Sequence, residues 1–438
     1  MHHQDNQRVR ITNPTCGFWK LLSLKFLNIE SIRIKPGPNR QHLPRLVIRA
    51  LASLLRFSVA KMNTRKALTI PGRTTALSAN YNQDHSCFAV GLEDGFAVMN
   101  SDPCELRIHR RFNGGVAIAI MLGRSNFLAL VGGGRDPKFP PNKVVIWDDA
   151  KQRVVITLEF KSDVLGVRLS RSRIVVVLRS HISIYTFSSP PQRLQAFETV
   201  YNDFGLTCLG SKHVAFPGRT IGQVNLFDLQ TGNNTIVPAH TSAIMALALS
   251  PNGDLLATAS ENGTLIRIFS TASSAIVTEL RRGIDKAMVY SMAFSPSSNR
   301  IAVTSDKGTL HIFDVLSQTP AASSSNSTTE QQRPSSRSAE TTSTGPMESN
   351  KRFSLLGKLP LLPKYFNSEW SFTQAKVEGV GRNSIGWTDE DTVIVTSTDD
   401  CKWEKFVILN APNTESGKAC EREAWRNFVE GVDIPFSR

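Results

Sequence analysis

Two adjacent arginines, Arg281 and Arg282, stand between two copies of one polar pattern. In the earlier copy the polar side chains are those of His240, Ser260, Thr264 and Arg267. In the later copy they are those of Ser305, Lys307, Thr309 and His311. Guanidinium groups combined with hydroxyls and a second cation donate several charge-assisted hydrogen bonds to one oxyanion, which a phosphate monoester requires. The pattern therefore predicts phosphate binding.

The spacing of the two arginines predicts two pockets rather than one. Neighbouring side chains of a strand point to opposite sides, so Arg281 and Arg282 suit separate sites on either side of it. A structural reading stands beside this one. Paired arginines at a strand end are often only solvated, His240 suits the start of a repeat, and Ser260 and Ser305 suit turns.

The elements that position these residues repeat along the chain. An inner strand ending in an aliphatic residue and a bulky one recurs at Val98-Met99, Ile146-Trp147, Ile184-Tyr185, Leu226-Phe227, Ile268-Phe269, Ile312-Phe313 and Val407-Ile408. The first six lie 38 to 48 residues apart, and the last lies 95 further on. A period near 45 residues with short strands predicts an all-β fold, a seven-bladed β-propeller of the WD-repeat type.

The long final interval indicates an insertion in the sixth blade. Residues 317–350 lack large apolar side chains, whereas 351–364 combine basic residues with Phe353, Leu355, Leu356, Leu359, Leu361 and Leu362. One reading is a linker followed by a packing strand. The other is a disordered segment leading into a membrane loop, in which the apolar side chains enter the interface and the lysines and arginines meet anionic headgroups.

Composition excludes several classes of function. Residues 1–61 hold 11 basic and 2 acidic residues, so nine of the fourteen net positive charges lie there and the remainder is too weakly basic for nucleic-acid binding. Six scattered cysteines and no metal-ligand spacing argue against a disulfide framework or a metal site. No catalytic motif is present, so we expect neither an enzyme nor a cofactor.

The predicted organisation has five parts. Residues 1–61 are expected to be a basic, disordered and dispensable extension. A mitochondrial presequence has a similar composition, and a start codon placed too early, upstream of Met62, is the other reading. Residues 62–316 form the blades up to part of the sixth, 317–364 form the insertion, 365–412 complete the sixth and seventh blades, and 413–438 form a C-terminal tail.

Three segments, ATASENGTLIRIF, TELRRGIDKA and VTSDKGTLHIF, resemble the PROPPIN family of WD-repeat propellers. Leu280 takes the first place of the family's Phe/Leu-Arg-Arg-Gly motif, as in its Hsv-like branch. The resemblance implies binding of phosphatidylinositol 3-phosphate and 3,5-bisphosphate, and action in autophagy on vacuolar, endosomal and preautophagosomal membranes. It places Arg281 in a first site with the earlier polar group and Arg282 in a second site with the later one.

The resemblance also implies partners. Asn82 and Asp84 resemble positions at which related proteins contact an autophagy lipid-transfer protein, and the insertion resembles the family's membrane-entering loop. The chain is expected to be a cytoplasmic monomer that reaches membranes peripherally. The alternative function is a WD-repeat protein-interaction scaffold that binds no lipid.

Overall fold

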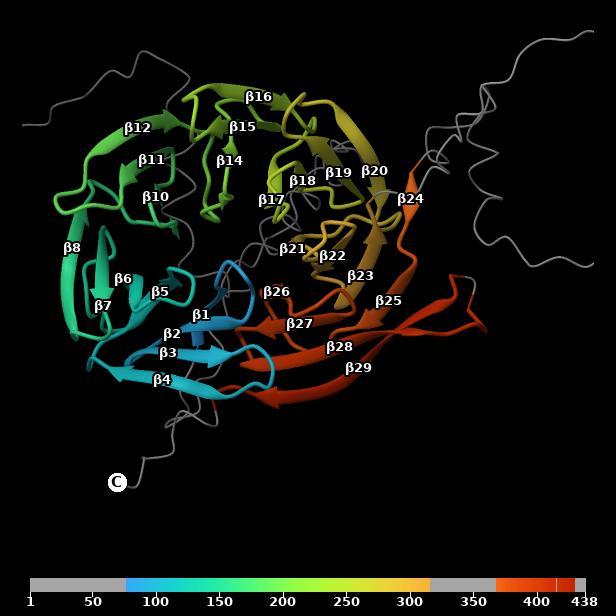
Figure 1. Ribbon diagram of the computed structural model, residues 1–438, viewed down its shortest axis with the longest axis horizontal. Helices are drawn as coiled ribbons and strands as arrows, with labels where there is room; N and C mark the ends of the chain where they lie inside the picture. Colours follow the sequence, from blue (N-terminus) through green and yellow to red (C-terminus); the bar gives the residue numbers. More distant parts are fainter. Residues whose placement is uncertain (1–75, 316–367, 415, 430–438) are drawn as a thin grey trace, which may run out of the picture. The chain divides into compact units, whose positions relative to one another are not determined.

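Seven small antiparallel sheets arranged in a ring make up the part of the chain that the computed structural model describes, which is residues 76–315, 368–414 and 416–429 (Figure 1). The prediction of a seven-bladed β-propeller is confirmed. The described residues contain no helix long and apolar enough to cross a membrane.

The strands follow one another in chain order within each sheet. The first sheet contains β1 (Ala76–Tyr81), β2 (Cys87–Leu92), β3 (Gly95–Asn100) and β4 (Leu106–Arg111). The second contains β5 (Val116–Met121), β6 (Phe127–Gly132), β7 (Lys143–Asp148) and β8 (Arg153–Glu159). The third contains β9 (Gly166–Leu169), β10 (Arg173–Val177), β11 (His181–Thr186) and β12 (Arg193–Glu198). The fourth contains β13 (Cys208–Leu209), β14 (His213–Pro217), β15 (Gln223–Asp228) and β16 (Asn234–Pro238).

The last three sheets carry the predicted polar groups and close the ring. The fifth sheet contains β17 (Ile244–Leu249), β18 (Leu255–Ser260), β19 (Leu265–Ser270), β20 (Ile276–Arg281) and a short added strand, β24 (Glu369–Trp370). The sixth contains β21 (Val289–Phe294), β22 (Arg300–Ser305), β23 (Thr309–Asp314) and β25 (Thr373–Lys376). The seventh contains β26 (Asn383–Trp387), β27 (Thr392–Ser397), β28 (Lys402–Asn410) and β29 (Lys418–Asn427).

The repeated aliphatic–bulky pairs all lie in the third strand of a sheet. β7 contains Ile146-Trp147 and β19 contains Ile268-Phe269. These strands were expected to be the inner ones, but the first strand of each sheet lines the central channel instead (Figure 1). The middle strands are packed between neighbouring sheets on both faces, which explains why their sequences are almost continuously apolar.

The core consists of seven buried clusters, each shared by two neighbouring sheets. One cluster joins the fifth sheet to the sixth, with Ala257 and Ile268 facing Val303 and Phe313. The cluster that closes the ring joins the first sheet to the seventh, where the rings of Phe88 and Phe428 lie 5.6 Å apart. Because every sheet has a neighbour on both sides, each of its two faces packs against another sheet.

The seventh sheet extends further along the chain than the sequence predicted. The expected tail from residue 413 is wrong, because Lys418–Asn427 forms β29, the outer strand of that sheet. Its sequence, KACEREAWRN, has no apolar run, since an outer strand is covered on less of its surface. The expectations for residues 1–61 and 317–364 lie outside the described residues.

A buried carboxylate ties β29 to the sheet. Glu404 is fully buried in β28 and accepts hydrogen bonds from the Gly379 amide at 2.9 Å and from Nη1 of Arg422, in β29, at 2.9 Å. Removing one partner of a buried ion pair leaves a charge without compensation.

We therefore expect Arg422→Leu to lower the free energy of unfolding by about 3–5 kcal/mol. Glu404→Gln combined with Arg422→Leu should recover part of the loss, since the neutral amide needs no counter-charge. Arg426→Leu, on the same strand but exposed, is the matched control and should cost less than about 1 kcal/mol. Denaturant unfolding measures all three; equal losses for Arg422 and Arg426 would contradict this account.

Candidate functional site

The strand β20 ends at Arg281, Arg282 follows it directly, and a polar cluster lies on each side of the strand. Leu280 packs into the cluster shared with the sixth sheet, so the side chains on either side of it in β20 face the fourth sheet. Arg281 pairs with Leu265, and Glu279 pairs with Arg267, which places these four residues on one face. Arg281 therefore shares its sheet face with Arg267, as predicted for the first pocket.

The first polar cluster, at the predicted first pocket between the fourth and fifth sheets, centres on Arg267. Its Nε donates to Glu279 Oε2 at 2.9 Å and its Nη1 donates to the Ala239 carbonyl at 2.7 Å. The adjacent His240 makes a 2.9 Å hydrogen bond from Nε2 to Thr258 Oγ1. Burial, reinforced by the charge of Arg267, lowers the pKa of His240 to about 4, so the ring is neutral at pH 7.

The second polar cluster, at the predicted second pocket between the fifth and sixth sheets, centres on Arg282. This side chain is 7% exposed; its Nε donates to the Gly263 carbonyl at 2.6 Å and its Nη2 donates to the carbonyl of Asp285. His311 is equally buried and hydrogen-bonds through Nδ1 to Ser371 Oγ at 3.2 Å. Burial and then the charge of Arg282 lower the pKa of His311 to about 4.

Arg282 is held by backbone oxygens rather than by a carboxylate. Among the described residues no carboxylate lies within ion-pair distance of its guanidinium, although Asp285 and Asp306 are near enough to oppose the lowering of its pKa by burial. The Gly263 carbonyl that it contacts requires a glycine. The φ of Gly263 is +59°, and a Cβ there would lie 1.8 Å from the Ala287 carbonyl oxygen.

The hydroxyl groups are distributed less symmetrically than the repeat predicted. Ser305, Thr309 and His311 alternate on the face of the sixth sheet that meets the fifth, and Ser260 lies on the face of Arg267. Thr264 differs. Its carbonyl accepts the Arg282 amide, so it lies opposite Arg282 rather than Arg281, and the register does not support its place in the first pocket.

The displacement of Thr264 has a simple cause. Four residues separate β18 from β19, whereas three separate β22 from β23. Leu265, not Thr264, therefore occupies the strand position of Thr309, while Arg267 and His311 remain equivalent as predicted. Lys307 lies in the shorter turn, is exposed, and donates its amide to Ser305 Oγ at 3.4 Å.

The sequence did not reveal the residues that hold Arg267 and the two histidines in place. Glu279 pairs with Arg267 and also accepts from Ser368 Oγ at 3.0 Å, and Thr258 and Ser371 hold the two histidines. Glu279 could have been found, because it precedes Arg281 by two residues and so must share its face. Ser371 could not, because it follows the insertion.

The predicted partner residues lie in the turn between β1 and β2. Asn82 is 3% exposed; its side chain accepts the Cys87 amide and donates to Ser86 Oγ, so it shapes the turn and offers little surface to a partner. Asp84 is half-exposed and pairs with Arg124 Nε at 2.8 Å. A partner contact by Asp84 stays a prediction.

The membrane-loop residues Phe353, Leu355, Leu356, Leu359, Leu361 and Leu362 lie outside the described residues. The structure does show where the chain returns. β24 pairs in parallel with β20, with Leu280 opposite Glu369 and Arg281 opposite Trp370, before the chain enters β25. No group of metal-ligating side chains occurs in the described part of the chain.

The fold defines the class of protein, a seven-bladed β-propeller, and cationic side chains lie on both sides of its fifth sheet. The family model described as PROPPIN matches residues 75–336. SVP1-like protein 2 of Emericella nidulans is 50% identical over 329 residues, covering 70% of this chain and 99% of that protein. SVP1-like protein 2 of Neurospora crassa is 39% identical, covering 84% of this chain and 99% of that protein. The chain belongs to the PROPPIN family, the phosphoinositide-binding propellers of autophagy.

Solved structures agree with the fold. Kluyveromyces lactis Hsv2, in a structure with complete loop 6CD, superposes with a TM-score of 0.65 at 24% identity, covering 81% of this chain and 99% of that one. The complex of KlAtg21 with the coiled coil of AgAtg16 contains a chain that superposes with a TM-score of 0.57 at 19% identity. The predicted family is confirmed.

The low pKa of His311 predicts acid sensitivity. In the unfolded chain the ring titrates near pH 6.5, so between pH 6.5 and about 4 the unfolded state binds more protons and stability falls as the pH falls. Between pH 7 and pH 5 this linkage costs about 2 kcal/mol. His311→Asn should reduce the measured loss by that amount in urea unfolding, whereas His181→Asn, at an exposed position, should not. Equal losses for wild type and His311→Asn would contradict the assignment.

Proposed function

We propose that this protein is a peripheral membrane protein that binds phosphatidylinositol 3-phosphate and 3,5-bisphosphate through the two pockets beside β20. The observation that carries the proposal is the repetition of one arrangement on both sides of the strand. Arg267 lies beside a neutral, half-buried His240, and Arg282 lies beside a neutral, buried His311. A phosphate bound there would meet a guanidinium, an imidazole and hydroxyl groups together.

The second pocket is the better prepared of the two. Arg282 is already desolvated and oriented by two carbonyl oxygens, so little side-chain entropy remains to be lost on binding. In the first pocket the ion pair with Glu279 occupies part of Arg267, and a phosphate must share the guanidinium with that carboxylate. We therefore expect the second pocket to bind the headgroup more tightly.

The insertion supplies the second means of attachment. Residues 351–364 combine leucines with basic residues, and the chain that follows them runs beside Arg281. Membrane contact by this segment would therefore occur next to the headgroup pockets. The proposed membranes are vacuolar, endosomal and preautophagosomal, and an autophagy lipid-transfer protein is the proposed protein partner.

Single and double substitutions of the arginines test the two-pocket arrangement. Arg281→Thr and Arg282→Thr should each leave one pocket, reducing the stoichiometry of soluble headgroup from two to one and weakening liposome flotation. The double variant should bind none, because each lost arginine–phosphate hydrogen bond is worth about 1.5–3 kcal/mol and bivalent attachment also disappears.

The matched control is Arg153→Thr, an exposed arginine on the outer strand β8, which should bind like wild type. Thermal unfolding checks that each variant is folded. A wild-type stoichiometry of one, or flotation of the folded double variant, would refute the two-pocket arrangement. Wild-type protein that does not respond to either lipid would favour the protein-interaction scaffold.

A second experiment separates headgroup binding from membrane insertion. Replacing Leu355, Leu356, Leu361 and Leu362 with Ser should weaken liposome binding, because each fully inserted leucine contributes about 1.5–3 kcal/mol. Titration with soluble headgroup should be unchanged. If headgroup binding and flotation fall together, the leucines pack within the protein instead.

A further inference from the structure

The central channel of the propeller carries an excess of positive charge. Its cavity has a volume of about 1330 Å³ and is lined by the first strand of each sheet. The charged residues that line it are Arg124, Arg168, Arg171, Arg382 and Asp84. The one carboxylate among them is already paired with Arg124 at 2.8 Å, so three arginines face the channel without a described carboxylate partner.

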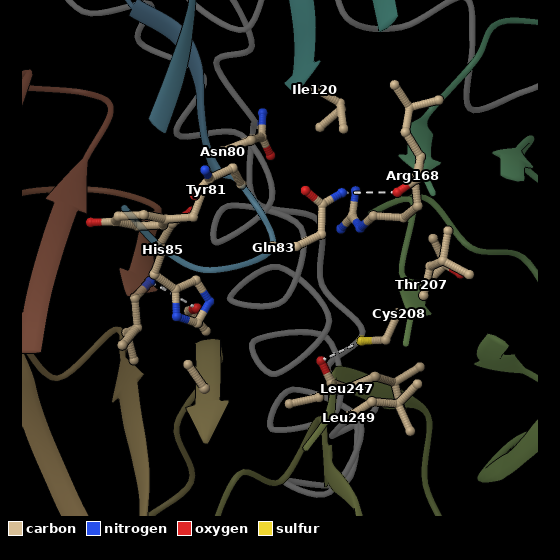
Figure 2. Close-up of a pocket in the computed structure, with 18 of the residues that line it drawn as sticks. Asn80, Tyr81, Gln83, His85, Ile120, Arg168, Thr207, Cys208, Leu247 and Leu249 are labelled. Carbon is tan, nitrogen blue, oxygen red and sulfur yellow. Dashed lines mark hydrogen bonds between the residues drawn. The ribbon is translucent and has the colours of Figure 1, made fainter. Parts of the chain in front are cut away.

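Arg168, within β9, is the least exposed of the four arginines. Among the described residues its guanidinium makes one hydrogen bond, from Nη1 to the Val167 carbonyl at 2.8 Å. Figure 2 shows the side chain extending into the channel towards Gln83. A guanidinium has five N–H donors, so most of those of Arg168 are available to a group inside the channel.

The neighbouring thiol does not neutralise Arg168. Cys208 donates from Sγ to the Leu247 carbonyl at 3.0 Å, and burial raises the pKa of its thiol to about 11 (Figure 2). At pH 7 the thiol is therefore uncharged. A cation that is partly removed from water and has no counter-charge is costly, and an anion in the channel would relieve that cost.

A polar side chain is fixed beside the arginine. Gln83 reaches across the channel from the turn after β1, donating from Nε2 to the Leu169 carbonyl at 2.9 Å and accepting the Gly123 amide at 2.6 Å through Oε1. Leu169 follows Arg168 directly, so the carboxamide is held next to the guanidinium. The channel wall therefore combines the hydrogen-bond donors of the Arg168 guanidinium with the Gln83 carboxamide, which is held by its bonds to Leu169 and Gly123.

We propose that the channel contains a binding site for a small free oxyanion of the phosphate class, held by the guanidinium of Arg168. The planar fork matches the oxygens of phosphate, as a bidentate contact requires. The proposed ligand is a free anion and not a lipid headgroup, so the probe in the test is inorganic phosphate. The Arg382 guanidinium lies 4.4 Å from the centre of the Phe204 ring, and both residues line the channel.

The test uses the full chain carrying Arg281→Thr and Arg282→Thr, so that the pockets beside β20 do not contribute. Inorganic phosphate should raise its melting temperature with the logarithm of its concentration above the dissociation constant, by about 2–4 °C at ten times that constant, relative to potassium chloride of equal ionic strength. Adding Arg168→Gln, or Arg168→Met if the first does not fold, should abolish this logarithmic rise. Calorimetric titration should give one phosphate per chain before this change and none after it.

Adding Arg153→Gln instead removes an exposed arginine on β8 and should leave the phosphate response intact. Phosphate also stabilises proteins non-specifically by exclusion from their surface, so a rise that is linear in phosphate concentration and persists without Arg168 overturns the proposal. The absence of a calorimetric signal with Arg168 present overturns it as well. Neither result bears on lipid binding, which the starting double variant already lacks under the proposed function.

Discussion

The packing of each sheet between two neighbours is the constraint on which the rest of this structure depends. Seven buried clusters join the sheets in sequence, and the seventh sheet closes on the first through residues such as Phe88 and Phe428. Because the middle strands are covered on both faces, polar side chains concentrate where the sheets end or diverge. The two cationic pockets lie at such places, on either side of the fifth sheet, and the channel is the other place where covering is incomplete.

The cations in these places are held in different ways, and this difference decides what each can bind. Arg267 is balanced by Glu279, Arg282 is oriented by backbone carbonyls, and Arg168 has a single carbonyl contact among the described residues. A guanidinium satisfied by a carboxylate gains little from a further anion, whereas one held only by carbonyls keeps its full charge. The demand for a counter-charge is therefore greater at Arg282 and Arg168 than at Arg267.

Much of the fold was predictable from local sequence, since a third strand buried on both faces selects pairs such as Ile268-Phe269. The opposite placement of Arg281 and Arg282 was predictable as well, because strand alternation follows from the backbone alone. Other features depend on register. The displacement of Thr264 arises from one extra residue in a turn. The strand β29 was not predicted because it is an outer strand, and its polar sequence lacks the apolar run that marks the buried strands. Arg168, a single cation in a short apolar strand, has no repeated signal that sequence reasoning could use.

The short strand β24 helps to fix the register of β20. Among the described sheets only the fifth has an additional strand, and it pairs with Leu280 and Arg281 alone. A slip of β20 by one residue would exchange the faces of its side chains, turning Arg281 towards the sixth sheet and Leu280 towards the fourth. With β19 on one side and β24 on the other, such a slip must break two ladders at once. The chain that follows the insertion thus helps to keep the side chains of Arg281 and Arg282 on opposite sides of the fifth sheet.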